Sequence, residues 1–129
     1  MTSVKKETSN ALLEYSSNIM FVRIKEGVLL SIDSMKEQYK TQEEMVGKDI
    51  YAVLVDGSNY SLVPQETRAF MAAYHPQNRI ATAVVSNSNL ATLMLANFYL
   101  KVNKPKITTR LFNKEKEAEE WLRYRLKKS

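Results

Sequence analysis

The residues best suited to chemistry in this chain of 129 residues gather around one junction between a strand and a helix. An apolar run, YAVLV, ends there, and a carboxylate, a glycine and several hydroxyls follow it closely. These residues are Asp56, Gly57, Ser58, Ser61, Glu66 and Thr67. Such a group could bind a phosphate, receive one from a kinase, or only close the corner between a strand and a helix.

The glycine content argues against a phosphate-binding loop. A Walker loop needs several glycines and a lysine, and a dinucleotide fingerprint needs three spaced glycines. The whole chain has only Gly27, Gly47 and Gly57, and no lysine lies in this stretch. The simplest interpretation is a corner in which Asp56 and Ser58 bind backbone groups, Gly57 adopts an unusual φ and Pro64 starts a helix.

No other constellation predicts catalysis or metal binding. The chain has no cysteine, and its one histidine, His75, follows a predicted helix and can bind its last carbonyls. Nucleophilic catalysis and metal sites need several such groups together. The acidic pairs at 43–44 and 119–120 lie among lysines and read as solvated helix surfaces. We therefore expect no enzyme, no metal and no cofactor.

The first half of the chain predicts a hairpin, a helix and a buried strand. Residues 11–16 and 19–27 are short apolar or alternating runs separated by Ser17-Asn18, as in a β-hairpin. A helical stripe follows, with Ser31 as its N-cap and Gly47 at its end. The run DIYAVLVDG is typical of a central strand buried on both faces.

Helices and strands alternate in the second half. We expect helices in PQETRAFMAAY, SNLATLMLANFYLKV and KEKEAEEWLRYRLKK, the last capped by Asn113, and strands in RIATAVVSN and ITTRLFN. The order β-β-α-β-α-β-α-β-α predicts an α/β fold with a mostly parallel five-stranded sheet, an N-terminal antiparallel hairpin and four helices. Residues 1–10 are expected to be a disordered lead-in, and residues 11–129 a single domain.

This arrangement resembles the STAS/CRAL-TRIO-like superfamily of small bacterial proteins, which includes the anti-sigma-factor antagonists. The resemblance covers residues 11–125 and rests on element order and on three stretches: MFVRIKEGV, VLVDGSNYSLVPQETRAFMA and ITTRLFNKEKEAEEWL. It implies a STAS-like fold and a non-catalytic role in protein interaction or regulation. In the antagonists a kinase phosphorylates a hydroxyl at the start of the helix after this strand. Here Gln65 and Glu66 stand in its place, with Thr67 where that family has a glycine, so the switch serine is missing.

A second hydroxyl-bearing stretch, Ser86-Asn87-Ser88, ends the next predicted strand. Parallel strands end at one edge of a sheet, where α/β folds usually bind ligands. We therefore predict one regulatory or ligand-binding loop cluster, formed by this stretch and the residues around Asp56.

The helix from Leu90 to Val102 is apolar almost all round, although a helix on a sheet needs only one apolar stripe. Its exposed face would include Leu90, Leu93, Met94, Phe98 and Tyr99. The surplus apolar face could be buried in three ways: by a second copy of the chain in a homodimer, by the preceding helix, or by an apolar ligand between helix and sheet.

Composition bounds the location and the partners. The N-terminus has no signal peptide and no apolar run reaches the about 18 residues that span a bilayer, so we expect a cytoplasmic protein without a membrane span. Residues 101–129 hold 10 Lys or Arg against 4 Asp or Glu, a net of +6. We predict a non-catalytic STAS-like interaction or regulatory module, a homodimer with an unidentified protein partner. The alternatives are a carrier or sensor of an apolar ligand and, less favoured, a nucleic-acid accessory protein using the basic end.

Overall fold

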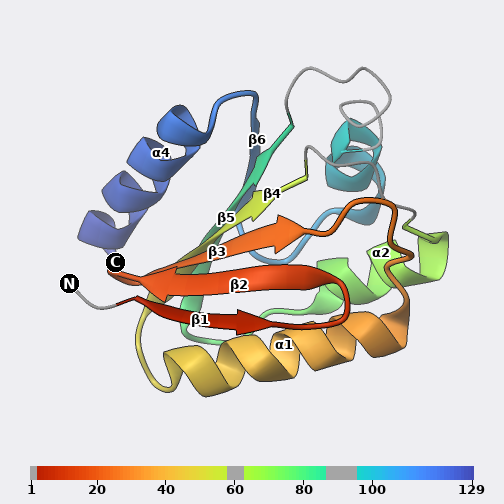
Figure 1. Ribbon diagram of the computed structural model, residues 1–129. Helices are drawn as coiled ribbons and strands as arrows, with labels where there is room; N and C mark the ends of the chain where they lie inside the picture. Colours follow the sequence, from red (N-terminus) through yellow and green to blue (C-terminus); the bar gives the residue numbers. More distant parts are fainter. Residues whose placement is uncertain (1–2, 58–62, 87–95) are drawn as a thin grey trace.

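A computed structural model describes residues 3–57, 63–86 and 96–129, and it contains one mixed sheet with helices on both faces (Figure 1). The strands lie in the order β1-β2-β3-β4-β5-β6. The elements are β1 (Val4–Glu7), β2 (Ala11–Ser16), β3 (Ile19–Ile24), α1 (Ile32–Val46), β4 (Tyr51–Asp56), α2 (Gln65–Ala73), β5 (Arg79–Val85), the π-helical turn η1 (Tyr99–Asn103), β6 (Thr109–Phe112) and α4 (Glu115–Lys128).

The sheet corrects the predicted one in strand number and direction. It has six strands instead of five, because β1 pairs antiparallel with β2 inside the stretch expected to be a disordered lead-in. It is mixed instead of mostly parallel: β1-β2 and β2-β3 are antiparallel, whereas β3-β4, β4-β5 and β5-β6 are parallel. All four residues of β1 are exposed, so it lacks the buried alternation by which a strand is found in a sequence.

The hairpin between β2 and β3 is confirmed, and its turn explains its shape. Ser17 and Asn18 both have positive φ, 52° and 67°, as a two-residue type I′ turn requires. Asn18 tolerates this conformation better than most residues, and its amide donates to the carbonyl oxygen of Ile50 at 2.9 Å. This bond ties the turn to the start of β4.

The predicted boundaries of α1 are confirmed. The Ser31 side chain accepts from the Ser34 amide at 3.0 Å, and the Ser34 hydroxyl in turn accepts from the Ser31 amide at 3.0 Å. This reciprocal capping box satisfies amides that the helix cannot bond itself. Gly47, at φ 57°, ends the helix, and its amide donates to the Glu43 carbonyl.

Two other predicted caps shift by one residue. Pro64 is the N-cap of α2, which begins at Gln65, and Lys114 in place of Asn113 is the N-cap of α4, with no side-chain capping bond. The charges of α4 complement the helix dipole: Glu115 and Glu117 lie in its first turn, and Arg125, Lys127 and Lys128 in its last.

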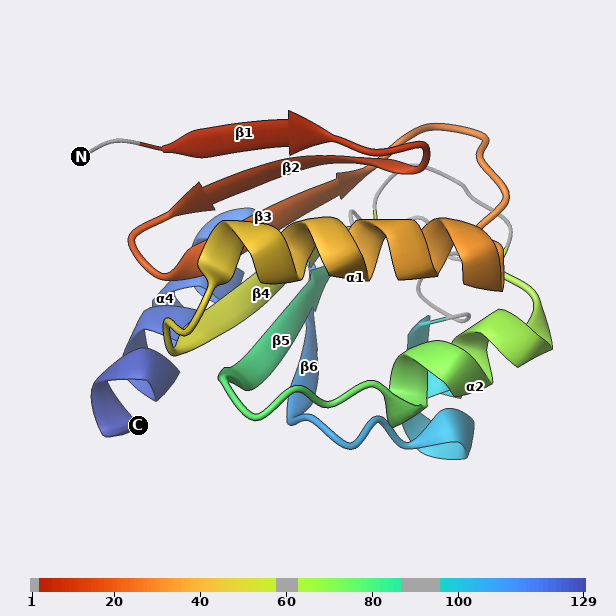
Figure 2. The ribbon, with the colours of Figure 1, turned by 90° about the horizontal axis from the view of Figure 1, so that it is seen from below.

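The helices divide the core into two layers (Figure 2). α1 and α2 lie on one face of the sheet, with η1 packed beside α2, and α4 covers the other face over β4, β5 and β6. Strand alternation assigns each residue to one layer. In register across five strands, one row on the α1 side comprises Leu13, Val22, Val55, Val84 and Leu111.

The two layers differ in how tightly they are filled. On the α4 side, small residues of the strands, Ala52, Ala81 and Ala83, let the helix come close, and Ala118 and Leu122 of α4 are fully buried against them. The α1 side is built from larger side chains, which surround a cavity described below. Among the described helices, none combines the length and the apolar character that a membrane crossing requires.

Candidate functional site

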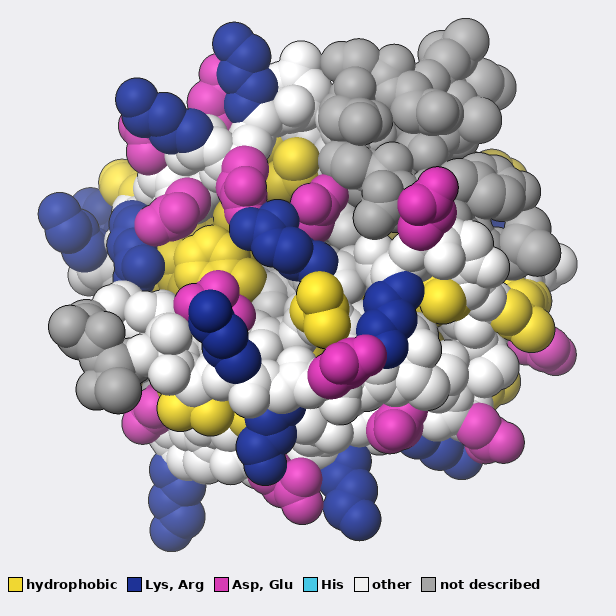
Figure 3. Space-filling view, in the orientation of Figure 1, with side chains coloured by type: hydrophobic (Ala, Val, Ile, Leu, Met, Phe, Trp, Pro, Cys, Tyr) yellow, Lys and Arg dark blue, Asp and Glu magenta, His cyan; other side chains and the backbone are white. Residues whose placement is uncertain are grey.

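Asp56, one of the two acids of the predicted loop cluster, lies at the end of β4 and faces the α4 side of the sheet. Its carboxylate accepts from Arg23 Nη1 at 3.1 Å, and Arg23 Nη2 contacts Glu115 at 2.9 Å. These bonds form part of a charged surface over β1, β2 and β3, where Lys25 also pairs with Glu7 at 2.5 Å. On this face of the molecule, basic and acidic side chains alternate (Figure 3). Asp56 is thus a member of a surface ion-pair network.

Gly57 differs from the prediction. The only glycines with positive φ in the described residues are Gly27 and Gly47, so the unusual φ expected at Gly57 is not found. Its amide donates to the Val85 carbonyl at 2.9 Å and extends the pairing of β4 with β5. A Cβ added there would meet the nearest atom, the Val85 oxygen, at 3.5 Å, which is an ordinary contact.

The described hydroxyls of the predicted cluster are buried. Thr67 is 1% exposed and Ser86 is fully buried, and within the described part of the chain neither hydroxyl oxygen has a hydrogen-bond partner. Glu66, by contrast, is exposed in the first turn of α2. A kinase could therefore reach Thr67 only after local opening. Four predicted residues of the cluster lie outside the described residues: Ser58, Ser61, Asn87 and Ser88.

The predicted apolar helix face is described only in part. Leu90, Leu93 and Met94 lie outside the described residues. Phe98 is 47% exposed and carries the Arg68 guanidinium 5.3 Å from its ring centre, whereas Tyr99 is partly buried and lines the cavity. Phe98 thus lies at the surface, and Tyr99 points into the interior.

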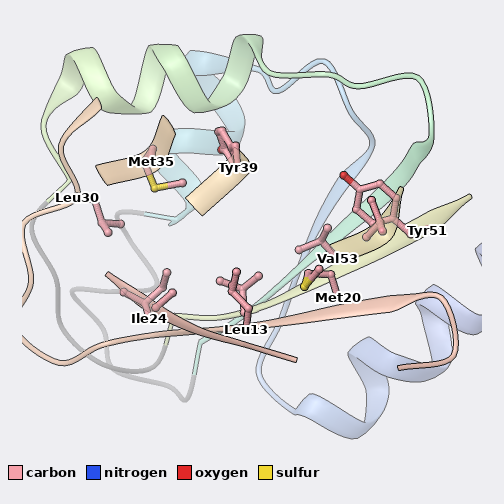
Figure 4. Close-up of a cluster of buried hydrophobic side chains, with 11 residues drawn as sticks. Leu13, Met20, Ile24, Leu30, Met35, Tyr39, Tyr51 and Val53 are labelled. Atoms are coloured by element: carbon pink, nitrogen blue, oxygen red, sulfur yellow. The ribbon is translucent and has the colours of Figure 1, made fainter. Parts of the chain in front are cut away.

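A cavity of about 190 Å³ lies between the sheet and the layer formed by α1, α2 and η1. Its walls are largely carbon: aliphatic residues of β3, β4 and β5 face α1 and α2 across it. Several of these residues belong to the buried cluster in Figure 4, including Ile24, Leu30, Met35, Tyr39 and Val53. The cavity is therefore built into the larger of the two core layers.

At one end of this cavity, Arg79 lies among three tyrosine rings. Its guanidinium carbon is 5.6 Å from the ring centre of Tyr39, 5.7 Å from that of Tyr51 and 5.1 Å from that of Tyr74. Tyr39 and Tyr74 stack on each other, with centroids 3.8 Å apart and planes 3° apart. Cation–π attraction holds the guanidinium against these rings.

A buried chain of amides leads away from Arg79 along α1. Arg79 Nη2 donates to Gln42 Oε1 at 2.7 Å, Gln42 Nε2 donates to Gln38 Oε1 at 2.7 Å, and Gln38 Nε2 donates to Asn10 Oδ1 at 2.9 Å. Gln38, Gln42 and Asn10 are each at most 2% exposed. Each amide donates to one neighbour and accepts from the other, so the chain fixes the side chain that receives the Arg79 bond.

Two of the tyrosines around Arg79, and Tyr99 in the cavity wall, have raised pKa values. Burial raises the pKa of Tyr39 to about 12. Burial raises the pKa of Tyr74 and of Tyr99 as well, and for Tyr74 the hydrogen bond from its hydroxyl to Glu43, at 2.6 Å, adds to the effect. A neutral phenol keeps its proton, so these groups present O–H donors at neutral pH.

The sequence prediction missed this cluster. Gln38 and Gln42 fall on the same helical stripe as Met35, Tyr39 and Val46, at spacings of three, four, seven and eleven residues, and all five are buried. Two glutamines on an apolar stripe were the available signal. Arg79, the first residue of an apolar strand, gave none, because its surroundings come from three separate elements.

His75 behaves as predicted, with Nδ1 2.8 Å from the carbonyl oxygen of Ala73 at the end of α2. Within the described residues, no three His, Asp or Glu side chains converge as metal ligands would. The described residues lining the cavity likewise include no Asp, Glu, His, Lys or Ser.

The comparisons with known proteins bear on the fold through one solved structure and on the family through a family model. The crystal structure of an uncharacterized protein of the DUF3478 family from Shewanella loihica PV-4, which has a SpoIIAA-like fold, matches 94% of this chain and 92% of its own, with a TM-score of 0.50 and 10% identity. This confirms the predicted resemblance in fold. No curated protein matches the chain. A family model described as a domain of unknown function, DUF7793, matches residues 13–125, and the chain therefore belongs to the DUF7793 family.

Proposed function

We propose that this chain is a non-catalytic binding module of STAS-like fold that takes a small, largely apolar ligand into the cavity beneath α1, α2 and η1. The observation that carries the proposal is the cavity itself, about 190 Å³ with mostly carbon walls. Small-molecule sites are concave and mostly apolar with a few placed polar groups, and this partly open space has that character. An engineered cavity of about 150 Å³ lined by Leu, Ile and Phe stays dry and binds benzene, so the volume here is enough for a single ring.

The lining supports binding without chemistry. A general acid or base needs a group that titrates near the working pH. The tyrosine pKa values here are shifted upward, away from neutrality, and the glutamines do not titrate. The absence of Asp, Glu, His, Lys and Ser among the described lining residues points the same way. The site is thus suited to holding a molecule unchanged.

The cavity borders both surface regions that the sequence marks for interaction with a partner protein. Its lining runs from Arg79, at the start of β5, to Gly57, at the carboxyl end of β4. Gly57 belongs to the predicted loop cluster, and Tyr99 belongs to the predicted interaction face. A ligand in the cavity would contact both regions from the inside, so its presence could be sensed by a protein that binds either one.

The test is a titration of the isotope-labelled protein with indole, a neutral apolar probe, followed by backbone and methyl NMR. We expect shifts confined to residues around the cavity, such as Met35, Val53 and Met71. The variant Val84→Phe, which fills the cavity from β5, should lose these shifts. Val102→Phe, at a position 57% exposed, is the matched control and should keep them. Shifts scattered over the surface, or none, would contradict the proposal.

A homodimer remains a second proposal, favoured by the exposure of the apolar segment after residue 95. Phe98 is 47% and Val102 57% exposed in the single chain. Two-fold dimers commonly cover such faces. Light scattering after size exclusion should give twice the chain mass for the wild type and the chain mass for Val102→Lys. A monomeric wild type would refute this second role without touching the first.

A further inference from the structure

We propose that the ligand of the cavity is a compact organic carboxylate whose charged group binds the Arg79 guanidinium while its carbon body fills the apolar space. This inference rests on the proposed function and names the class of ligand. It follows from the charge of the lining, from the donors that Arg79 has left, from the way Arg79 is held and from the size of the space.

The charge of the lining is one-sided. Two cations, Arg68 and Arg79, line the cavity, and no Asp or Glu does so among the described residues. Neither arginine forms an ion pair within the described part of the chain. The nearby carboxylate of Glu43 accepts from the Tyr74 hydroxyl, at 2.6 Å. A partly buried cation without a counter-charge is costly, and an anionic ligand would supply that charge.

Arg79 has donors to spare. A guanidinium carries five N–H bonds in a planar fork. The structure places Arg79 Nε 3.3 Å from the Tyr51 hydroxyl oxygen and Nη2 2.7 Å from Gln42 Oε1. Both acceptors are neutral, so the charge stays uncompensated and three N–H bonds remain. A carboxylate matches this fork and accepts two parallel bonds from it.

The guanidinium is also held in place before any ligand arrives. Tyr39, Tyr51 and Tyr74 surround it, and the amide chain from Asn10 through Gln38 fixes the oxygen of Gln42 that it binds. Such fixing lowers the ordering cost that binding would otherwise carry. A chain of three buried amides is more than the packing of one arginine side chain needs, and it is what positioning of a binding group requires.

The size of the space limits the carbon body. At about 190 Å³, the cavity is somewhat larger than the about 150 Å³ that accommodates benzene. A single ring, or a short branched chain, with one carboxylate fits this space. A long fatty acid does not.

The experiment compares sodium benzoate with benzamide, which has nearly the same shape and no charge, by NMR titration of the full chain. We expect benzoate to bind at least about tenfold more tightly, the range of a charged hydrogen bond over a neutral one. Benzoate binding should weaken as salt is raised, because salt screens the attraction, whereas benzamide binding should not. In Arg79→Gln the preference should disappear. Arg110→Gln is the control, since Arg110 also lies over aromatic rings, those of Phe112 and Trp121, but does not line the cavity.

The outcomes separate this inference from the proposed function. Equal binding of benzoate and benzamide within the cavity would overturn the carboxylate and leave the binding module standing. A preference that survives Arg79→Gln, or that vanishes only in Arg68→Gln, would overturn the role of Arg79. No response to indole, benzamide or benzoate would overturn both proposals. If Arg79→Gln does not fold, the arginine Nε–Hε signals of the wild type decide instead: one signal should shift with benzoate and stay in place with benzamide.

Discussion

The buried amide chain offers a sharp test of how the site is held together, through the substitution Gln42→Met. Methionine keeps the unbranched shape and the helix propensity of glutamine, so the change removes hydrogen bonds and little else. Two bonds are lost: the one from Arg79 Nη2, at 2.7 Å, and the one to Gln38 Oε1, at 2.7 Å. The first involves a charge and contributes about 1.5–3 kcal/mol, and the second is neutral and contributes about 0.5–1.5 kcal/mol.

Part of this loss is recovered, because an amide no longer has to be desolvated, which is worth about 0.5–2 kcal/mol. The expected result is a decrease of about 1–3 kcal/mol in the free energy of unfolding. Urea unfolding, followed by the fluorescence of the single tryptophan, Trp121, measures this decrease. The dependence of the free energy on urea concentration should stay the same as in the wild type. Glu44→Met, on the exposed side of α1, is the matched control and should change stability by less than about 0.5 kcal/mol.

A second substitution, Gln38→Met, tests whether the amides act as a chain. Since Gln38 bonds Gln42 directly, the double variant should lose less stability than the sum of the two single variants. Strict additivity, or a Gln42→Met variant as stable as the wild type, would refute the reasoning that these buried amides hold Arg79 in place.

Three further predictions concern single positions. Gly47→Ala should lower the free energy of unfolding by about 1–2 kcal/mol, because the φ of Gly47 is 57°. Gly57→Ala should leave that free energy unchanged or raise it by up to about 1 kcal/mol, because Gly57 has no positive φ and a Cβ there makes only an ordinary contact. Urea unfolding of both variants checks this, and a large loss of stability in Gly57→Ala would contradict the geometry. Thr67→Val should raise stability by about 1 kcal/mol, because it removes a buried hydroxyl without a partner in the described residues; a loss by the same assay would show that the hydroxyl is bonded. The raised pKa of Tyr39, about 12, favours the neutral phenol in the folded state. The stability that this phenol contributes is therefore fully present below pH 10 and is lost as the pH rises toward 12, by up to about 3 kcal/mol. Absorbance at alkaline pH should show this tyrosine ionising later than a free one, and a normal titration would contradict its burial.

The parts of the fold that local pattern dictates were predictable. The capping serine and the terminal glycine of α1 fix its ends, and the apolar run of β4 identifies a strand paired on both sides. In α4 the stripe through Ala118 and Leu122 identifies the buried side. In each case one short stretch carries the signal, because the element's own periodicity decides which side is buried.

The parts that depend on partners were not predictable. β1 is a strand only because β2 offers an edge to pair with, and its residues VKKE show no buried side. Around Arg79, the start of β5 contacts α1 and the end of α2, at Tyr74. No pattern within one short stretch of the sequence predicts contacts between such distant elements. The loop cluster around Asp56 carried the strongest local signal, yet Asp56 lies in a surface ion pair and Thr67 is buried.

The central claim is that an apolar space within the α1 layer is a binding site, and a crystal structure under xenon pressure tests it most directly. Xenon enters dry apolar cavities that are large enough for it. We expect xenon density within contact of Val53, Met71 and Tyr99, and none between α4 and the sheet. A space occupied by ordered waters, or closed by these side chains with no xenon between them, would contradict the account.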